Sequence, residues 1–288
     1  MDVQQRRRIA IVGLTAPAYL WLALAVFLPL SAMLYFSFLT VAPFGGREAE
    51  LTLKHYRAFI DKPLYRDLAW ISLKLGFHVT LICVLMGYPA ALALARYVKG
   101  RWREALFLLV VLPFWSNALV RTFSWTMVLR GDGLVDRMIQ AVLPWAPSLD
   151  LLFSYPAVVI GLVHAYLPYM ILTCYISLQA IDDSLIEAAR SLGASGATAF
   201  RRVILPLSVP GLIAGTVLIF VPVIGSFMEP RILGGPRAAT MLGTVIEEQF
   251  TRIFNWPFGA ALSFILLGIV LLILALSYPL LRRPMQAM

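Results

Sequence analysis

The chain has 288 residues, of which 60% are apolar and 14% are charged. Soluble domains typically carry about 25% charged residues, so this composition excludes an ordinary water-soluble fold. The 24 Lys and Arg residues against 15 Asp and Glu give a formal net charge of +9. Basic residues in a membrane protein first serve to fix its topology, so the excess does not indicate a nucleic-acid partner.

Six apolar stretches are each long enough to cross a bilayer, which takes roughly 20 residues. Backbone groups in lipid must be satisfied within the segment, and these stretches lack the alternation of barrel strands, so each is predicted to be a helix. The predicted fold is all-α: a polytopic membrane protein with six transmembrane helices, in a single domain over 1–288. The spans are expected at about 11–38, 68–95, 105–129, 153–178, 209–231 and 258–281.

The distribution of basic residues predicts that both termini are cytoplasmic. The two tails and the second and fourth loops hold 12 of the 24 Lys and Arg residues. The bias is sharpest in the segment 96–104, where four of nine residues are basic. By the positive-inside rule these segments face the cytoplasm.

The usual patterns of catalysis and cofactor binding are missing from the sequence. Cys83 and Cys174 lie inside apolar stretches, and no lysine follows a phosphate-binding glycine loop. The three histidines form no H-E-x-x-H motif, and there is no G-x-S-x-G motif. We therefore expect no catalytic residue, metal site or bound cofactor in this chain, which disfavours a membrane-bound enzyme.

The cytoplasmic segment of about 180–208 is predicted to contain two short helices. Ser184 is expected to cap the first, with Glu187 completing an S-x-x-E capping box. Gly193 suits the left-handed position that ends this helix, and Ser195 is expected to cap the second. The alternative is an ordinary amphipathic connector that packs on its own bundle. The second helix is predicted to run through Thr198, Phe200, Arg201 and Val203, and to be interrupted at Pro206 and Pro210.

This segment resembles the EAA signature of permease subunits of ABC importers. Glu187-Ala188-Ala189 is followed after three residues by Gly193, and nine residues later by Val203-Ile204-Leu205-Pro206. The one departure is Val203, where isoleucine is commoner. The resemblance implies a coupling helix that docks on a separate ATPase subunit, which would bind ATP and Mg. The residues expected to make this coupling contact are Glu187, Ala188, Ala189, Arg190, Ser191 and Gly193.

Further segments resemble the spermidine/putrescine branch of these permeases. They imply a type I importer (MetI-like) fold in a bacterial inner membrane, with a first helix that wraps a neighbour and five core helices. They also imply an ATPase dimer, a second related permease that forms a heterodimer with this chain, and an extracytoplasmic substrate-binding protein. The segments are Gly87-Tyr88-Pro89-Ala90, Pro113-Phe114-Trp115-Ser116-Asn117 with Arg121, Leu233-Gly234-Gly235 and Asn255-Trp256-Pro257-Phe258-Gly259-Ala260.

Glu229 is the sharpest candidate for the substrate pathway, because ionisable groups within spans are costly and tend to face a cavity or a partner. It lies where two prolines and a glycine can break the fifth helix, as happens at transport sites. A carboxylate beside Phe227 would attract an amine cation. The alternative places Glu229 at the outer end of its helix, paired with Arg231 or water.

Other pathway candidates lie in the third and fourth spans. Trp115, Asn117, Arg121 and Trp125 lie in the third span, and 117, 121 and 125 repeat every four residues, so a helix would place these three on one face. Arg121 is alternatively a structural partner for an acidic residue of the neighbouring permease. The full set of pathway candidates is Glu229, Phe227, Trp115, Asn117, Arg121, Tyr166 and Tyr169, the two tyrosines having a packing or interfacial role as their alternative.

The sequence thus predicts a polyamine-type ABC importer permease that leaves ATP hydrolysis to a partner. One rival is a permease for another solute, such as an amino-acid derivative, sulfate or iron. A rival of another class is an ion-coupled secondary transporter, which would need no ATPase.

Overall fold

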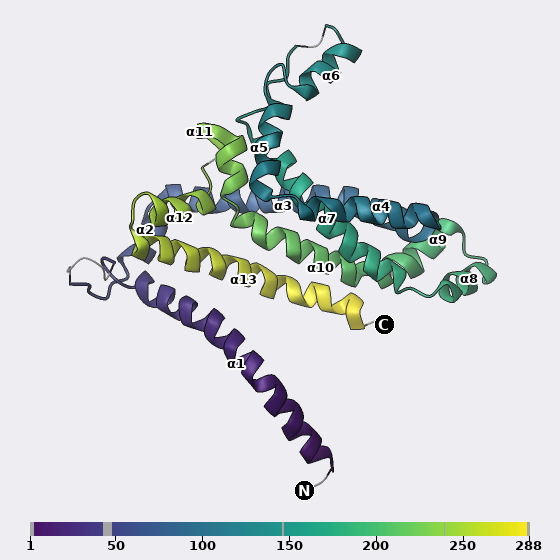
Figure 1. Cartoon of the computed structure of the whole chain (residues 1–288), viewed down its shortest axis with the longest axis horizontal. Helices are drawn as coiled ribbons and strands as arrows, with labels where there is room; N and C mark the ends of the chain where they lie inside the picture. Colours follow the sequence, from purple (N-terminus) through teal and green to yellow (C-terminus); the bar gives the residue numbers. More distant parts are fainter. Residues whose placement is uncertain (1–2, 43–47, 146, 239, 287–288) are drawn as a thin grey trace. The chain divides into compact units, whose positions relative to one another are not determined.

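The computed structural model describes residues 3–42, 48–145, 147–238 and 240–286, and their regular structure is helical, which confirms the all-α prediction (Figure 1). Two compact units are formed, Met1–Pro63 with Ile246–Leu267, and Leu64–Val245 with Gly268–Met288. The helices are α1 (Val3–Ser37), α2 (Lys54–Asp61), α3 (Pro63–Leu92), α4 (Arg101–Val111), α5 (Ala118–Leu129), α6 (Leu134–Val142), α7 (Tyr155–Gln179), α8 (Asp183–Ser191), α9 (Gly196–Ala199), α10 (Leu205–Ile224), α11 (Gly235–Ala238), α12 (Leu242–Thr251) and α13 (Trp256–Gln286). Shorter segments are the π-helical η1 (Ala93–Tyr97), η3 (Phe200–Ile204) and η4 (Pro230–Gly234), and the 3-10 segment η2 (Leu112–Trp115).

Over the described residues, five helical stretches have the length and apolar character of a membrane span. The predicted third span is different, because Arg101–Trp115 and Ala118–Val142 meet at an angle of 100°. The prediction of one straight helix over 105–129 is therefore wrong. Pro113 lies in the 3-10 segment that ends the first arm, and Ser116 and Asn117 adopt extended backbone. The five stretches are Val12–Ser37, Pro63–Tyr97, Tyr155–Gln179, Gly196–Ile224 and Trp256–Ser277.

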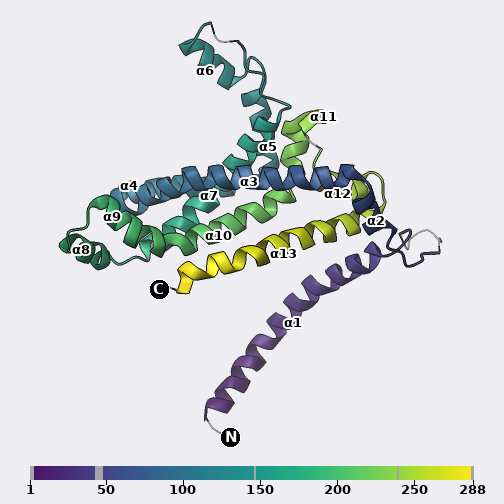
Figure 2. The ribbon, with the colours of Figure 1, turned by 180° about the vertical axis from the view of Figure 1, so that it is seen from behind.

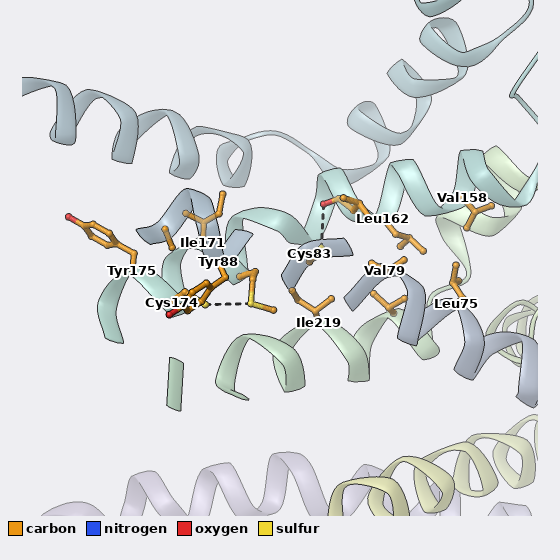
Figure 3. Close-up of a cluster of buried hydrophobic side chains, with 14 of the residues drawn as sticks. Leu75, Val79, Cys83, Tyr88, Val158, Leu162, Ile171, Cys174, Tyr175 and Ile219 are labelled. Atoms are coloured by element: carbon orange, nitrogen blue, oxygen red, sulfur yellow. Dashed lines mark hydrogen bonds between the residues drawn. The ribbon is translucent and has the colours of Figure 1, made fainter. Parts of the chain in front are cut away.

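The core of the second unit lies where α3, α7 and α10 run side by side (Figures 1 and 2). In Figure 3, Leu75 and Val79 of α3 face Leu162 of α7 and Ile219 of α10, and all four side chains are fully buried. Lipid is as apolar as these side chains, so close packing supplies most of the stabilisation. Tyr88 of α3 also makes a 2.7 Å hydrogen bond to the Ser208 hydroxyl of α10.

Gly215 allows α10 to approach α7 closely. A Cβ atom placed on Gly215 would lie 2.5 Å from Thr173 Oγ1 and 2.7 Å from Met170 Sδ, both on α7. Small residues at such contacts are the common means by which membrane helices pack.

We expect Gly215→Val to destabilise this unit by about 1–3 kcal/mol, the usual cost of overpacking a close contact. The matched control is Gly268→Val in α13, where an added Cβ would meet nothing within 4 Å. Thermal unfolding in detergent should show a lower midpoint for Gly215→Val alone. Equal midpoints for the two variants would contradict the close contact.

The first unit contains α1, α2 and the turn between them. Leu39 and Leu51 form an antiparallel bridge, and Ser37 Oγ lies 2.7 Å from the Tyr56 hydroxyl. His55 of α2 is buried, and its Nε2 lies 2.9 Å from the carbonyl oxygen of Leu39. Burial lowers the pKa of His55 from 6.5, and Lys54 adds to the effect, while the bond to Leu39 opposes it.

This turn should loosen in acid. The unfolded chain binds a proton at His55 more readily than the folded chain does, so the stability from neutral His55 is complete above about pH 6.5 and is lost as the pH falls below that value. We expect hydrogen exchange of the amides around Leu39, corrected for its intrinsic pH dependence, to accelerate between pH 7 and pH 5. The His55→Gln variant should lack this acceleration. An equal acceleration in both proteins would exclude His55 as its cause.

Candidate functional site

Glu229 lies just after a break in the helix, as predicted. The helix α10 ends at Ile224, capped by Gly225, so the predicted fifth span is too long at its outer end. Glu229 directly precedes the π-helical segment η4, and its Oε2 accepts a 2.6 Å hydrogen bond from the hydroxyl of Ser226. Phe227 lies in the same break, with 45% of its side chain exposed. The break therefore holds a half-buried carboxylate outside regular helix packing.

Tyr166 of α7 joins several of the predicted residues. Its phenol lies within electrostatic range of Glu229, Tyr169 and Arg121. The rings of Tyr166 and Tyr169 lie 5.9 Å apart, centroid to centroid, and Phe114 packs edge-on against Tyr169 at 4.7 Å. The structure thus brings together a carboxylate, a guanidinium and three aromatic rings from separate parts of the sequence.

Trp125 of α5 connects this helix to α7, whereas Arg121 of the same helix bonds back to the bend in the third span. Arg121 Nη1 donates to the carbonyl oxygen of Pro113 at 3.0 Å, so one of its hydrogen-bond donors is already used within the bend of the third span. Trp125 Nε1 donates to His164 Nδ1 at 3.2 Å. His78 of α3 is also hydrogen-bonded, since its Nδ1 lies 2.9 Å from the Tyr155 hydroxyl. We refer to Glu229, Ser226, Tyr166, Tyr169, Phe114, Arg121, Trp125 and His164 as the pathway cluster.

Two residues that were predicted for the substrate pathway, Asn117 and Trp115, lie outside the helix α5. Asn117 was expected to share a helix face with Arg121 and Trp125, but it is the N-cap of α5, where its side-chain oxygen accepts a 2.8 Å bond from the Leu119 amide. Trp115 belongs to the preceding 3-10 segment and has 86% of its side chain exposed. The shared-face prediction fails for Asn117 because the helix begins only at Ala118.

Four cluster members are outside the full set of pathway candidates predicted from the sequence: Ser226, Phe114, Trp125 and His164, although Trp125 was expected on the same helix face as Arg121. The hydroxyl of Ser226 lies three residues before Glu229, a spacing that suggests a local hydrogen bond once a break in the helix is assumed. His164 lies five residues before Tyr169 on α7, so a regular helix turns the two side chains about 140° apart, and helical spacing did not group them. Phe114 meets Tyr169 only through the bend, which sequence periodicity does not reveal.

The chemistry of the pathway cluster suits an organic cation. Aromatic faces attract ammonium groups, and the Glu229 carboxylate supplies the opposite charge and accepts hydrogen bonds. The positive charge of Arg121 repels a cation, although one of its guanidinium nitrogens is bonded to the carbonyl oxygen of Pro113. Among the described residues, no group of His, Cys, Asp or Glu side chains is arranged to hold a metal ion.

The predicted coupling segment forms a second candidate site, at one end of the α7 and α10 helices (Figure 1). Every side chain of α8 is at least partly exposed, including Leu185 at 48%. Leu192, which caps the helix, is 89% exposed. Apolar side chains exposed on a short helix are typical of a surface that another protein covers. Glu187 and Arg190 line a groove of about 540 Å³ between α8 and the residues around α9.

The prediction is right for the C-terminal end of α8 and wrong for its N-terminal cap. Asp182, not Ser184, caps the start, because its side chain accepts a 2.9 Å bond from the Ser184 amide. This bond, with a second from the Ser184 side chain, lowers the pKa of Asp182. At the other end Gly193 has φ of +86°, and its amide and that of the next residue bond the carbonyls of Arg190 and Ala189 at 2.9 and 3.0 Å. This is the Schellman pattern, in which glycine is favoured.

The second short helix also differs in part. Ser195 caps α9 as predicted, accepting from the Thr198 amide at 3.3 Å. Pro206 and Pro210 do not interrupt the chain, since η3 leads directly into α10. Pro206 lies just after the π-helical turn η3, so the stretch continues through a local change of hydrogen-bond pattern and does not end there. The fifth span therefore begins well before residue 209.

Solved structures define the class of this fold. This chain is similar in structure to a bacterial ABC transporter involved in the import of the acidic polysaccharide alginate. The TM-score is 0.74 and the sequence identity 16%, over 96% of both chains. A TM-score of 0.58 and 19% identity relate it to the MetNI methionine ABC transporter, with 77% of this chain and 96% of that chain covered. The fold is that of ABC importer permeases.

Sequence comparison gives the family. Residues 84–283 match the binding-protein-dependent transport system inner membrane component family. The chain is 37% identical over 258 residues to the spermidine/putrescine transport system permease protein PotB of Haemophilus influenzae, covering 90% of this chain and 89% of that protein. It is also 37% identical over 260 residues to PotB of Escherichia coli, covering 88% and 92%. The chain belongs to this family of multi-pass inner membrane transport components.

Proposed function

We propose that this chain is a permease subunit of an ABC importer for spermidine, putrescine or a related polyamine. The observation that carries the proposal is the 37% identity to PotB proteins over about nine tenths of both chains. The pathway cluster supports it, since Glu229 and the aromatic rings of Tyr166 and Tyr169 offer the charge and surface that an amine needs.

The same proposal assigns the partners. An ATPase dimer binds ATP and Mg and docks on α8, whose exposed apolar side chains would be covered by it. A second, related permease forms a heterodimer with this chain, and an extracytoplasmic binding protein delivers the solute. Both termini then lie in the cytoplasm, on the same side as α8 and the basic segment 96–104.

Transport would proceed by alternating access. Closure of the ATPases on ATP moves α8 and opens the central pathway toward the binding protein. The released polyamine passes along the exposed aromatic side chains and Glu229. After hydrolysis the pathway reopens toward the cytoplasm. In this chain no bond of the solute is made or broken, so its residues bind and position only.

The experiment that tests the solute is a ligand screen by thermal shift on the cognate binding protein. Spermidine and putrescine should raise its midpoint of unfolding, while amino-acid derivatives, sulfate and iron should not. A shift with sulfate or iron alone would overturn the polyamine assignment and leave the permease class intact.

A further inference from the structure

Arg96 connects three segments of the second unit through one side chain. It lies in η1, the π-helical extension of α3. Its Nη2 donates to the carbonyl oxygens of Leu178, at 2.8 Å, and Ile181, at 2.9 Å, at the end of α7. Its Nη1 pairs with the carboxylate of Asp183, the first residue of α8. Two spanning helices and the proposed coupling helix thus meet at one guanidinium.

The geometry of this contact requires arginine. The last carbonyls of a helix have no intrahelical partner, and a planar guanidinium can bond several acceptors at once, which a lysine ammonium does with less geometric definition. The Arg96 side chain is only 14% exposed, whereas its partner Asp183 is 81% exposed. The guanidinium is therefore fixed in the protein, and Asp183 connects it to the surface helix.

The local backbone of η1 also contributes to the position of Arg96. The amide of Val98 bonds the carbonyl of Ala93, five residues back, which defines a π-helical turn. The last turn before the extended residue Val98 is therefore π-helical, and Arg96 lies within this turn.

We propose that Arg96 is a positioning residue for coupling, which makes α3 and α7 follow the displacement of α8. The inference rests on the proposed function, because it requires that an ATPase moves α8. When α8 is displaced, Asp183 moves with it, and the bonds from Arg96 to Leu178 and Ile181 keep the two spans together. Without Arg96, the same displacement of α8 would move α3 and α7 less.

The test is performed on the full complex of both permeases, the ATPase and the binding protein in proteoliposomes, measuring uptake and ATP hydrolysis together. We expect Arg96→Gln to retain at least half of the stimulated hydrolysis while the polyamine transported per ATP falls at least about fivefold. Arg96→Lys should recover part of the ratio. The matched control is Arg103→Gln, because Arg103 in the first turn of α4 donates from Nε to the nearby carbonyl of Val98. This control should keep the wild-type ratio.

A wild-type ratio in Arg96→Gln would overturn the inference. If Arg96→Gln does not assemble, Asp183→Asn provides the test, since Asp183 is largely exposed and its replacement leaves the bonds to α7 in place. It should also lower the ratio, and an unchanged ratio would again overturn the inference. Failure of the wild-type chain to bind any ATPase would instead overturn the proposed function, so the two failures are distinguishable.

Discussion

Replacing Glu229 with glutamine should lower the maximal rate of polyamine uptake about tenfold. Glutamine keeps the size and a hydrogen-bond acceptor for Ser226, but removes the charge that attracts the amine. Hydrogen bonds to charged groups contribute about 1.5–3 kcal/mol, and about 1.4 kcal/mol corresponds to a factor of ten. The binding protein largely sets the apparent affinity, so the Michaelis constant should change little. Initial rates of radiolabelled spermidine uptake in proteoliposomes provide the measurement.

Two further variants make the Glu229 result specific. Ser226→Ala removes the 2.6 Å bond but keeps the carboxylate, and should retain most of the uptake. Glu104→Gln removes an exposed carboxylate from the first turn of α4 and should have no effect. If Glu229→Gln transports at the wild-type rate, Glu229 has a structural role only.

The second large effect is expected for Gly193→Asp, which should insert normally but lose at least nine tenths of ATP-driven uptake. At φ of +86° a side chain costs about 1–2 kcal/mol locally, and the Schellman turn that ends α8 is weakened. Apart from the neighbouring residues in the chain, nothing lies within 4 Å of a Cβ at this position, so the added carboxylate would point into open space, where the proposed ATPase would dock. Uptake and co-purification of the ATPase are both measured.

Gly100→Asp is the matched control for this variant. Gly100 also has a positive φ, of +60°, and open space around a Cβ, but it lies at the start of α4 and not in the lining of the groove beside α8. It should retain most of the uptake. Normal uptake in Gly193→Asp would contradict the assignment of α8 as the docking surface.

Local sequence signals predicted the coupling segment well. Gly193 ends α8 in the left-handed conformation, and Ser195 caps α9, because caps depend on a few neighbouring residues. The error at the start of α8 had the same local origin, since Asp182 and Ser184 are both good capping residues and the sequence does not decide between them.

Apolar content predicted which segments are helical but not where they bend. The stretch 105–129 is continuous in hydropathy, although Pro113 and the capping preference of Asn117 divide it. Once it is divided, Arg121 bonds back to Pro113, and Phe114 reaches Tyr169. These contacts depend on the angle of the bend, which no residue pattern specifies.

The pathway cluster shows the same limit. The sequence identified Glu229, Arg121, Tyr166 and Tyr169 as separate candidates, because polar groups in spans are unusual. Their convergence around Tyr166 requires the packing of α5, α7 and the break after α10. Arg96 was predicted only as a topology signal, since its bonds to the end of α7 are long-range.

The most direct test of the proposed function is spermidine uptake into proteoliposomes that contain this chain, its permease partner and the ATPase, with the binding protein outside. We predict uptake only when ATP is supplied to the ATPase and the binding protein is present, with ATP hydrolysis stimulated by the loaded binding protein. Uptake by this chain driven by an ion gradient, without the ATPase, would contradict the account and indicate a secondary transporter.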